Sequence, residues 1–239
     1  MGLKEAALDS VSFRAAVIHI GDQVDQVEKW LDNYAKAVTR MAQEVGTLET
    51  LTTGFLSAAA PPQGISEAII DHDYTLQAAK RFGEGSQTFW GATIQALRKL
   101  ESNMAAPMRN FLENEIRPFK DARRTLVETQ RIYDNVGVKY YSQKKTTEAS
   151  SLREDAFQLH EARKAYLRAS LDFAVAAPQL RMALDKTLVR IFHDQSKNIG
   201  PGRNAAFNNW ATEIDRIRGW GKEMEMGERV FRQIGRAHV

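Results

Sequence analysis

A repeat of apolar residues near the amino terminus constrains the fold more than any other feature. Between residues 13 and 48, an apolar side chain recurs alternately four and three positions apart. A β-strand alternates every two residues, and an isolated straight helix drifts out of a 3.5-residue repeat. The repeat therefore predicts a long helix wound against other long helices. Its positions are Phe13, Val17, Ile20, Val24, Val27, Leu31, Tyr34, Val38, Met41, Val45 and Leu48.

The ends of this first helix are marked by capping and breaking residues. Either Ser10 or Ser12 can act as the N-cap, because a serine oxygen accepts a hydrogen bond from a free backbone N–H of the first turn. The stretch SAAAPPQG, residues 57 to 64, contains two prolines and a glycine that end the pattern.

A second helical pattern runs from about Glu67 to about Lys145. Its early part is loosened by glycines at 83, 85 and 91. At 1.5 Å per residue, a continuous helix of this length would measure about 110 to 120 Å, which a compact globule of this size does not accommodate. The apolar positions include Ile94, Leu97, Met104, Met108, Phe111, Phe119, Leu126, Tyr133, Val136 and Tyr140.

A third pattern follows the polar stretch at residues 142 to 151. It keeps the four-three rhythm from Leu152 to Ile191, and we expect it to stop before the Gly-Pro-Gly of residues 200 to 202. A shorter amphipathic segment with Phe207, Trp210 and Trp220 then predicts a fourth helix. The fold class is therefore all-α, with three long, kinked, antiparallel helices in a coiled coil and a short carboxy-terminal helix.

Pro107 and Pro118 lie inside the second pattern, eleven residues apart. Eleven residues of α-helix turn through about 1100°, so the two rings lie roughly 20° from the same face. Each proline removes a backbone hydrogen bond and kinks a helix in a defined direction. Two kinks on one face predict a helix bent one way, with Pro178 contributing on the third helix. The alternative is that each proline starts a separate helix after a short turn.

The patterns also suggest domain boundaries. We expect a lead-in at residues 1–9, one helical domain at 10–199, and a helix or linker toward a further domain at 200–233. The last six residues, IGRAHV at 234–239, look like the translation of a sequencing-library adapter. We therefore exclude them and expect the natural protein to continue beyond residue 233.

Composition and motifs exclude several classes. The chain contains no cysteine, which rules out disulfides and thiolate metal sites and is typical of a cytosolic protein. It lacks a signal peptide and an apolar run of about 18 residues, so we expect peripheral membrane contact only. It also lacks HExxH, phosphate-binding loops and G-x-S-x-G. We expect no catalytic residue, cofactor or metal, and we interpret DHD at 71–73 as charges at a helix start.

Positive charge is concentrated in mid-chain. Residues 1 to 57 hold 5 basic and 8 acidic residues, a balance of −3, whereas residues 96 to 145 hold 11 and 6, a balance of +5. Four basic residues are spaced three, four and seven positions apart along one side of the second helix, and three more continue toward its end. The predicted membrane-binding residues are Arg117, Lys120, Arg124, Arg131, Lys139, Lys144 and Lys145.

Two alternatives accompany this prediction. The stripe can be an ordinary solvated helix face with ion pairs such as Arg117 with Asp121 and Lys120 with Glu113. Close by, Tyr140 and Tyr141 suit a lipid interface, where aromatic rings are favourable. The favoured interpretation is that Tyr140 caps the core and only Tyr141 is exposed.

Local sequence carries a family resemblance. The segments YDNVGVKYYSQKK, residues 133 to 145, and EARKAYLRASLDFAVAAPQLRMALDKTLVRIF, residues 161 to 192, resemble BAR domains that precede a PH domain, as in the ACAP and APPL groups. The family has Tyr-Asp before the tip and an Arg-x-x-Tyr/Phe-x-x-x-Ser-Leu-Asp-Tyr stretch on helix 3. Here these features are Tyr133-Asp134 and Arg163, Tyr166 and Ser170-Leu171-Asp172-Phe173.

Two further segments narrow the resemblance. Residues 13 to 32 and 213 to 232 are most similar to fungal BAR-PH proteins that continue into a START-like sterol-transfer domain and a membrane anchor. The resemblance spans about residues 10 to 232. It implies a peripheral protein of the cytoplasm, at the endoplasmic reticulum or membrane contact sites in the intact protein.

The resemblance also implies a function. A crescent-shaped homodimer would dock its basic concave face on anionic phospholipid membranes and sense or support their curvature. Attraction of about 1 kcal/mol per basic residue near the surface would weaken as salt rises. The alternative is a dimeric scaffold that recruits a small GTPase or kinase without binding lipid. Nucleic acid is not an expected partner, because the chain is nearly neutral with few exposed aromatics in the basic segment.

Overall fold

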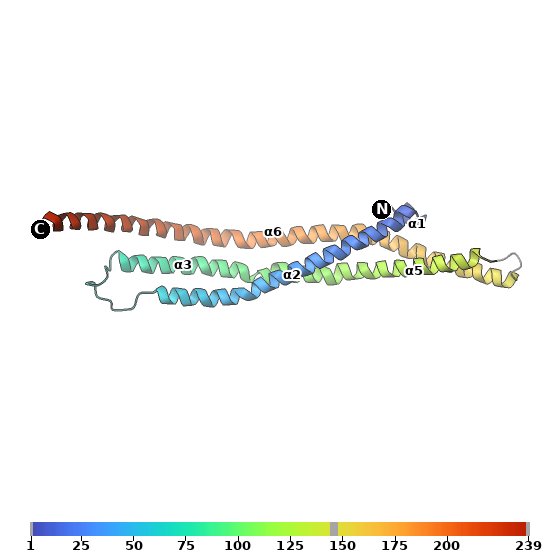
Figure 1. The fold of residues 1–239 in the computed structure, drawn as a ribbon, viewed down its shortest axis with the longest axis horizontal. Helices are drawn as coiled ribbons and strands as arrows, with labels where there is room; N and C mark the ends of the chain where they lie inside the picture. The colour runs from blue at the N-terminus through green and yellow to red at the C-terminus, as the bar shows by residue number, and fades with distance from the viewer. Residues whose placement is uncertain (1, 144–147, 238–239) are drawn as a thin grey trace. The chain divides into compact units, whose positions relative to one another are not determined.

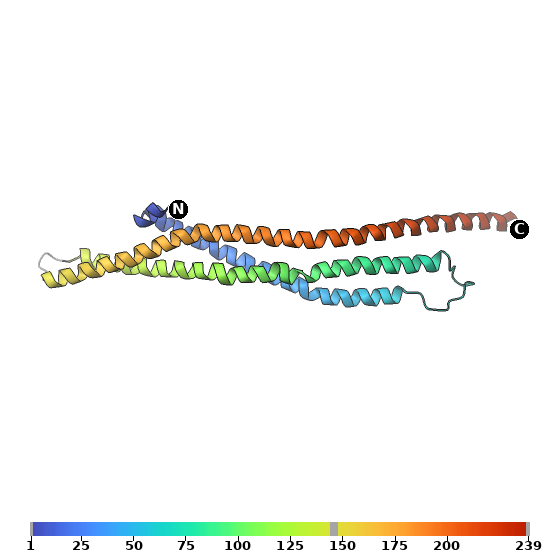
Figure 2. The same cartoon turned by 180° about the vertical axis from the view of Figure 1, so that it is seen from behind.

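The computed structural model describes residues 2–143 and 148–237, and all regular structure within them is helical. Three long helical stretches run antiparallel (Figures 1 and 2), which confirms the predicted all-α class with three long antiparallel helices. The elements are α1 (Leu3–Ala7), α2 (Val11–Ala59), α3 (Thr75–Arg98), η1 (Glu101–Ala105), α4 (Ala106–Phe111), η2 (Leu112–Ile116), α5 (Arg117–Tyr141) and α6 (Ala149–Ala237).

The chain forms two compact units, and α2 and α6 each contribute one part to both. The first unit comprises residues 1–36 and 105–191, and the second comprises residues 37–104 and 192–239. The first unit contains α1 and α5, whereas α3 belongs to the second.

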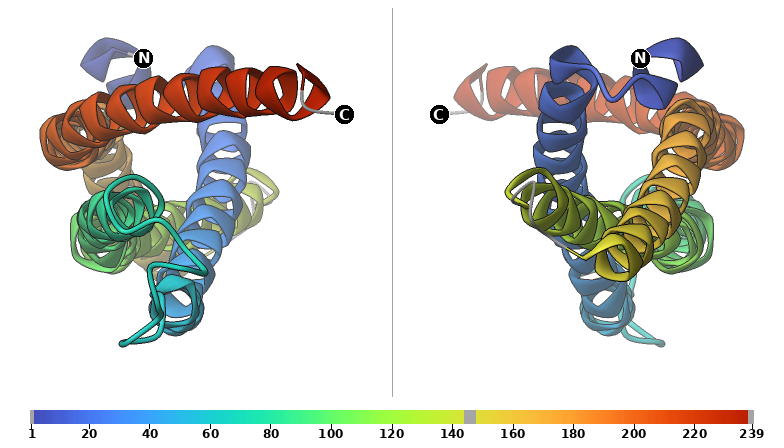
Figure 3. Two further views of the ribbon diagram at one scale, coloured as in Figure 1. Left: turned by 90° about the vertical axis from the view of Figure 1, so that its left-hand side faces the viewer. Right: turned by 90° about the vertical axis from the view of Figure 1, so that its right-hand side faces the viewer.

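The first unit has a continuous apolar core. Viewed from the end where α5 and α6 meet, α2, α5 and α6 surround it (right-hand view of Figure 3). Phe119 and Phe173 pack with ring centroids 5.1 Å apart, and Phe173 is fully buried. The predicted heptad positions therefore face inward, because only the core-facing stripe of each helix escapes water. Core members from α2, α4, η2, α5 and α6 include Phe13, Val17, Val24, Leu31, Phe111, Ile116, Leu126, Tyr166 and Leu180.

The second unit is held by aromatic contacts between α3 and the end part of α6. The rings of Phe89 and Trp210 lie 5.2 Å apart, and Phe82 lies 5.9 Å from the same tryptophan. Gly85 permits this approach, since a Cβ at that position would lie 2.3 Å from Cδ1 of Trp210. Met41, predicted to pack in the seam of α2, is 53% exposed.

Pro107 and Pro118 do not end the helical path. Each stands two residues after a π-helical turn, η1 before Pro107 and η2 before Pro118. A proline cannot donate to the carbonyl four residues earlier, and its ring presses on that group. The wider π turn relieves this pressure while the chain stays helical. The alternative of separate helices after short turns is therefore wrong, and a consistent direction of bending stays a prediction.

The prediction that the third helix stops before Gly200 is also wrong. In the structure α6 runs through Gly200, Pro201 and Gly202, so the expected short fourth helix is its continuation. These three residues are not buried, so water can satisfy the carbonyl that Pro201 leaves unpaired. Buried Gln195 on one side and buried Ala206 on the other keep the helix in register across the breakers.

The helix ends agree with the capping residues, with one shift. Ser10 Oγ accepts a hydrogen bond from the backbone N–H of Phe13 at 3.1 Å, so Ser10 caps α2. Asp71 Oδ1 accepts from the N–H of Tyr74 at 2.6 Å, which supports the reading of residues 71–73 as a helix start. This start places α3 at Thr75 rather than near Glu67, because residues 60 to 74 form a loop.

Candidate membrane-binding surface

The predicted basic stripe lies on α5, and most of it is exposed. The side chains of Arg117, Arg124 and Arg131 are 71%, 80% and 69% exposed. Residues seven apart on an α-helix differ by only about 20° around the axis, so these three arginines form one row. We call them the arginine row.

Lys120 has a different position from the arginine row. Its side chain is 37% exposed, and Nζ lies 2.5 Å from Glu28 and 3.1 Å from Asp25, both on α2. Arg123, which the stripe prediction omitted, is 25% exposed and lies 3.1 Å from Asp25. These contacts join α5 to α2. Lys120 is therefore engaged in helix pairing and differs from the exposed arginine row.

Electrostatics at this junction favour the charged forms. The hydrogen bond to Glu28 raises the pKa of Lys120, which outweighs the lowering by burial. Burial alone raises the pKa of Asp25, but hydrogen bonds from Lys120 and Arg123 bring it below its usual value. Gly21 leaves room for this network, because a Cβ there would lie 2.0 Å from the guanidinium carbon of Arg123.

Each arginine of the row forms an ion pair with an acidic residue three or four positions earlier in the sequence. Arg117 pairs with Glu113 at 2.8 Å, Arg124 with Asp121 at 3.3 Å, and Arg131 with Glu128 at 2.9 Å. The pairings considered from sequence, Arg117 with Asp121 and Lys120 with Glu113, are therefore wrong. Exposed pairs of this kind contribute about 0 to 1 kcal/mol, so a phosphate can replace the carboxylate at small cost.

A hollow of about 630 Å³ lies beside the π-helical turn η2. Three predicted residues, Arg117, Lys120 and Arg124, line it together with Leu112. Glu28, Glu113 and Asp121 line it as well, so its formal charge is balanced. The hollow brings together basic side chains that the sequence placed only along a stripe.

The end of α5 is held to α6 by a buried carboxylate. Lys139 Nζ lies 2.8 Å from Asp155, whose side chain is only 9% exposed. The Gln143 side-chain amide donates to the other oxygen of Asp155. Lys139 itself remains 64% exposed. The remaining two predicted residues, Lys144 and Lys145, lie outside the described residues.

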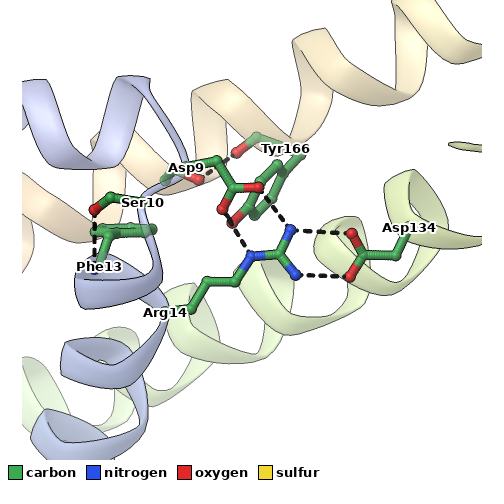
Figure 4. A network of polar contacts seen from close by, with 7 residues as sticks. Asp9, Ser10, Phe13, Arg14, Asp134 and Tyr166 are labelled. Atoms are coloured by element: carbon green, nitrogen blue, oxygen red, sulfur yellow. Dashed lines mark hydrogen bonds and ion pairs between the residues drawn. The ribbon is translucent and has the colours of Figure 1, made fainter.

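A polar network near the amino terminus joins α2, α5 and α6 (Figure 4). Arg14 donates to Asp9 at 2.6 and 2.8 Å and to both oxygens of Asp134 at 2.9 and 3.0 Å. The hydroxyl of Tyr166 donates to Asp9 at 2.5 Å. Asp9 has a φ of 49°, in the left-handed region that aspartate tolerates better than most residues.

The network shifts the titration of its members. Burial raises the pKa of Asp9, but hydrogen bonds from Arg14 and Tyr166 outweigh it and leave the pKa below its usual value. Burial, reinforced by the bond to Asp9, raises the pKa of Tyr166 to about 12. The hydrogen bonds to Asp9 and Asp134 raise the pKa of Arg14. Asp9, Arg14 and Tyr166 therefore keep their paired forms at neutral pH.

Several residues that carried the family resemblance belong to this network and to the core, whereas Arg163 and Asp172 are exposed. Tyr133 stacks on Tyr166 with centroids 5.5 Å apart, and Asp134 binds Arg14. Ser170 is buried and donates to the carbonyl of Tyr166 at 2.8 Å. These positions hold the helices together. Sequence reasoning missed the network, because Arg14 and Asp134 are 120 residues apart and nothing local links them.

In the described part of the chain, no helix combines the length and apolarity required to cross a bilayer. Over the same residues, histidines and carboxylates nowhere gather into a group of three suited to a metal ion.

Comparisons with known proteins give one family and three curated relatives. A family model described as "BAR domain of APPL family" matches residues 1–192. The membrane-anchored lipid-binding protein SIP3 of Saccharomyces cerevisiae is 28% identical over 201 residues, which cover 79% of this chain and 16% of that protein. LAM1, also a membrane-anchored lipid-binding protein of that yeast, is 24% identical over 210 residues, covering 83% and 17%.

A third relative comes from another yeast. A PH domain-containing protein of Schizosaccharomyces pombe, described as uncharacterized, is 24% identical over 183 residues, covering 77% of this chain and 15% of its own length. The chain thus spans about one sixth of the length of these curated relatives.

Proposed function

The chain belongs to the APPL family of BAR domains, and on this basis we propose that it is the dimerising, membrane-docking module of a larger lipid-binding protein. Its partner would be an anionic phospholipid membrane whose curvature the module senses or supports. The observation that carries the proposal is the arginine row, exposed at heptad spacing along one face of α5. No catalytic step is part of the proposal.

The arginine row supports docking for an electrostatic reason. A basic side chain near an anionic leaflet contributes about 1 kcal/mol, and the attraction falls off within a Debye length. The local carboxylates offset part of this attraction, but they are themselves 53% to 66% exposed and well hydrated. Lys120 is assigned to helix pairing, since it is already held by two carboxylates of α2.

Vesicle co-sedimentation tests this proposal. The protein is mixed with phosphatidylcholine vesicles that contain or lack phosphatidylserine, over a range of salt. We expect binding only to the anionic vesicles, decreasing as salt rises. The triple change Arg117→Glu, Arg124→Glu, Arg131→Glu is expected to weaken it at least about tenfold.

A matched control reverses three exposed basic residues of α6. Lys164, Arg181 and Arg218 are 70%, 85% and 67% exposed, so Lys164→Glu, Arg181→Glu, Arg218→Glu changes the net charge equally. An equal loss of vesicle binding in both triple variants would show that binding depends on net charge alone. Equal binding to anionic and neutral vesicles, or to neither at low salt, would overturn the proposal.

The second unit supports the dimer. Met41, Leu51 and Phe55 are 53%, 67% and 52% exposed, and at 100° per residue they fall within about 80° of arc on α2. An uncovered apolar face on a long helix favours a second copy. Sedimentation equilibrium should report a dimer that Leu51→Glu with Phe55→Glu converts to a monomer. Thr50→Glu with Thr53→Glu, on exposed polar positions, should leave it intact.

A further inference from the structure

The paired ends of α5 and α6 project from the first unit. In Figure 1 both ribbons continue past α1 and α2. The start of α2 is anchored further back, because Arg14 binds Asp134 and the neighbouring Asp9 binds Tyr166. The last turns of α5 and the first turns of α6 are therefore a two-helix projection.

This projection is held rigidly. Asp155 is buried between the two helices and accepts from both Lys139 and Gln143. A buried carboxylate with two donors ties the last turn of α5 to the first turns of α6.

Four of those outer side chains are large and apolar. Val138 and Tyr141, at the end of α5, are 71% and 79% exposed. Leu152 and Phe157, at the start of α6, are 42% and 61% exposed. We call these four the apolar tip. Two helices that pack only against each other must expose their outer faces to water. Polar residues at these positions would avoid contact between water and apolar groups.

The apolar tip continues the arginine row. Val138 follows Arg131 by seven residues and Arg124 by fourteen, so the three lie on one face of α5. Along this face the exposed side chains change from cationic to apolar toward the end of the helix. That order matches the depth profile of a bilayer, in which the phosphates lie at the surface and the acyl chains lie deeper.

We propose that the apolar tip inserts into the boundary between headgroups and acyl chains of an anionic bilayer, while Arg124 and Arg131 contact its phosphates. This inference rests on the proposed function. A second copy of the tip is a poorer partner, because it would bring its own Arg131 and Lys139 against those of the first. A membrane supplies the complementary negative charge.

The absence of cysteine from the sequence allows a direct test. A single Tyr141→Cys variant carries an environment-sensitive fluorophore at the tip, and Ile18→Cys, on an α2 residue that is 61% exposed, carries it at a control position. Both are mixed with phosphatidylserine-containing vesicles made with or without brominated acyl chains. We expect a blue shift and quenching by bromine at position 141 and neither at position 18.

Substitutions provide a second readout in the unlabelled protein. Val138→Ser with Tyr141→Ser should weaken binding to these vesicles about tenfold, since two apolar groups no longer leave water. Val11→Ser with Ile18→Ser removes two exposed apolar side chains of α2, 86% and 61% exposed, and should change it little. Circular dichroism checks that both variants remain helical.

Each outcome decides the inference. Bromine quenching at position 141 alone supports insertion. Vesicle binding with the 141 label still in water overturns insertion and leaves the proposed function standing. A blue shift without vesicles identifies a second copy as the partner and also overturns it. Failure of the wild-type protein to bind anionic vesicles overturns the proposed function, and the inference with it.

Discussion

The two units have similar lengths but differ in how completely they bury their interiors. Among the described residues, the first unit buries 18 hydrophobic side chains and the second buries 7. Polar groups show the opposite trend. In the described part of the chain, five buried side-chain atoms lack a hydrogen-bond partner, and four of them, on Arg81, Ser86, Gln195 and Trp210, belong to the second unit.

This difference suggests a division of labour. The first unit covers its core and satisfies its polar network, so it can present charged and apolar side chains outward as a stable platform. Within the described residues, the second unit buries fewer apolar side chains and leaves four buried polar atoms unpaired. Unpaired polar atoms of this kind are typical of a surface that a further partner completes. Four predictions test the comparison.

The largest effect is expected in the core of the first unit. Phe173→Ala should lower the free energy of unfolding by about 3 to 5 kcal/mol, because it leaves a cavity against Phe119. In the second unit Leu100→Ala should cost less, about 2 kcal/mol, because this unit buries fewer apolar side chains. Chemical denaturation measures both. Exposed Phe157→Ala is the control, and equal losses at Phe173 and Leu100 would break the comparison.

The next effect concerns the aromatic contact of the second unit. Gly85→Ala should cost about 1 to 3 kcal/mol, because its Cβ would overlap the ring of Trp210 and push α6 from α3. Gly91→Ala, in the same helix with no atom within 4 Å of the added Cβ, should instead stabilise by about 0.5 to 1 kcal/mol. Thermal unfolding of the two variants tests this prediction. A change in stability of the same sign in both variants would contradict the packing described.

A pH dependence is expected from the polar network. The pKa of Tyr166 is raised to about 12, so above pH 10 the unfolded chain loses this proton first. Its stabilisation is thus complete below pH 10 and is lost as pH rises toward 12. Tyr166→Phe should be about 1 kcal/mol less stable than wild type at pH 8, with the gap closing by pH 12.

Denaturation at several pH values tests that prediction. Comparison with the variant cancels the titration of lysines, which both proteins share. Tyr141→Phe, at a side chain 79% exposed, should follow the wild type throughout. A gap between wild type and Tyr166→Phe that stays constant up to pH 12 would count against the network.

The smallest effects separate the two kinds of basic residue on α5. Arg123→Ala should cost about 1 kcal/mol, because it leaves Asp25 with Lys120 alone at the junction with α2. Arg131→Ala should change stability by less than about 0.5 kcal/mol, since its pair with Glu128 is exposed. Denaturant midpoints of the two variants measure both losses of stability. A larger loss for Arg131→Ala would show that the arginine row stabilises the fold.

Helix identity was predictable, but helix continuity at breakers was not. The four-three spacing predicted each long helix, because one stripe of every helix must leave water. Gly200, Pro201 and Gly202 predicted a stop that packing on both sides overrides. Similarly, the spacing of Arg117, Arg124 and Arg131 predicted a shared face, whereas the position of Lys120 depended on carboxylates of α2 about 90 residues away.

By itself the sequence determined the all-α class, the three long helices, and the concentration of basic residues on α5, because heptad spacing and local charge are properties of adjacent turns. Tertiary structure alone decided which basic residues face solvent, and it brought Asp9, Arg14, Asp134 and Tyr166 together. The reason is physical. A side chain's exposure and partners depend on the helix that packs beside it, and that helix comes from a distant part of the chain.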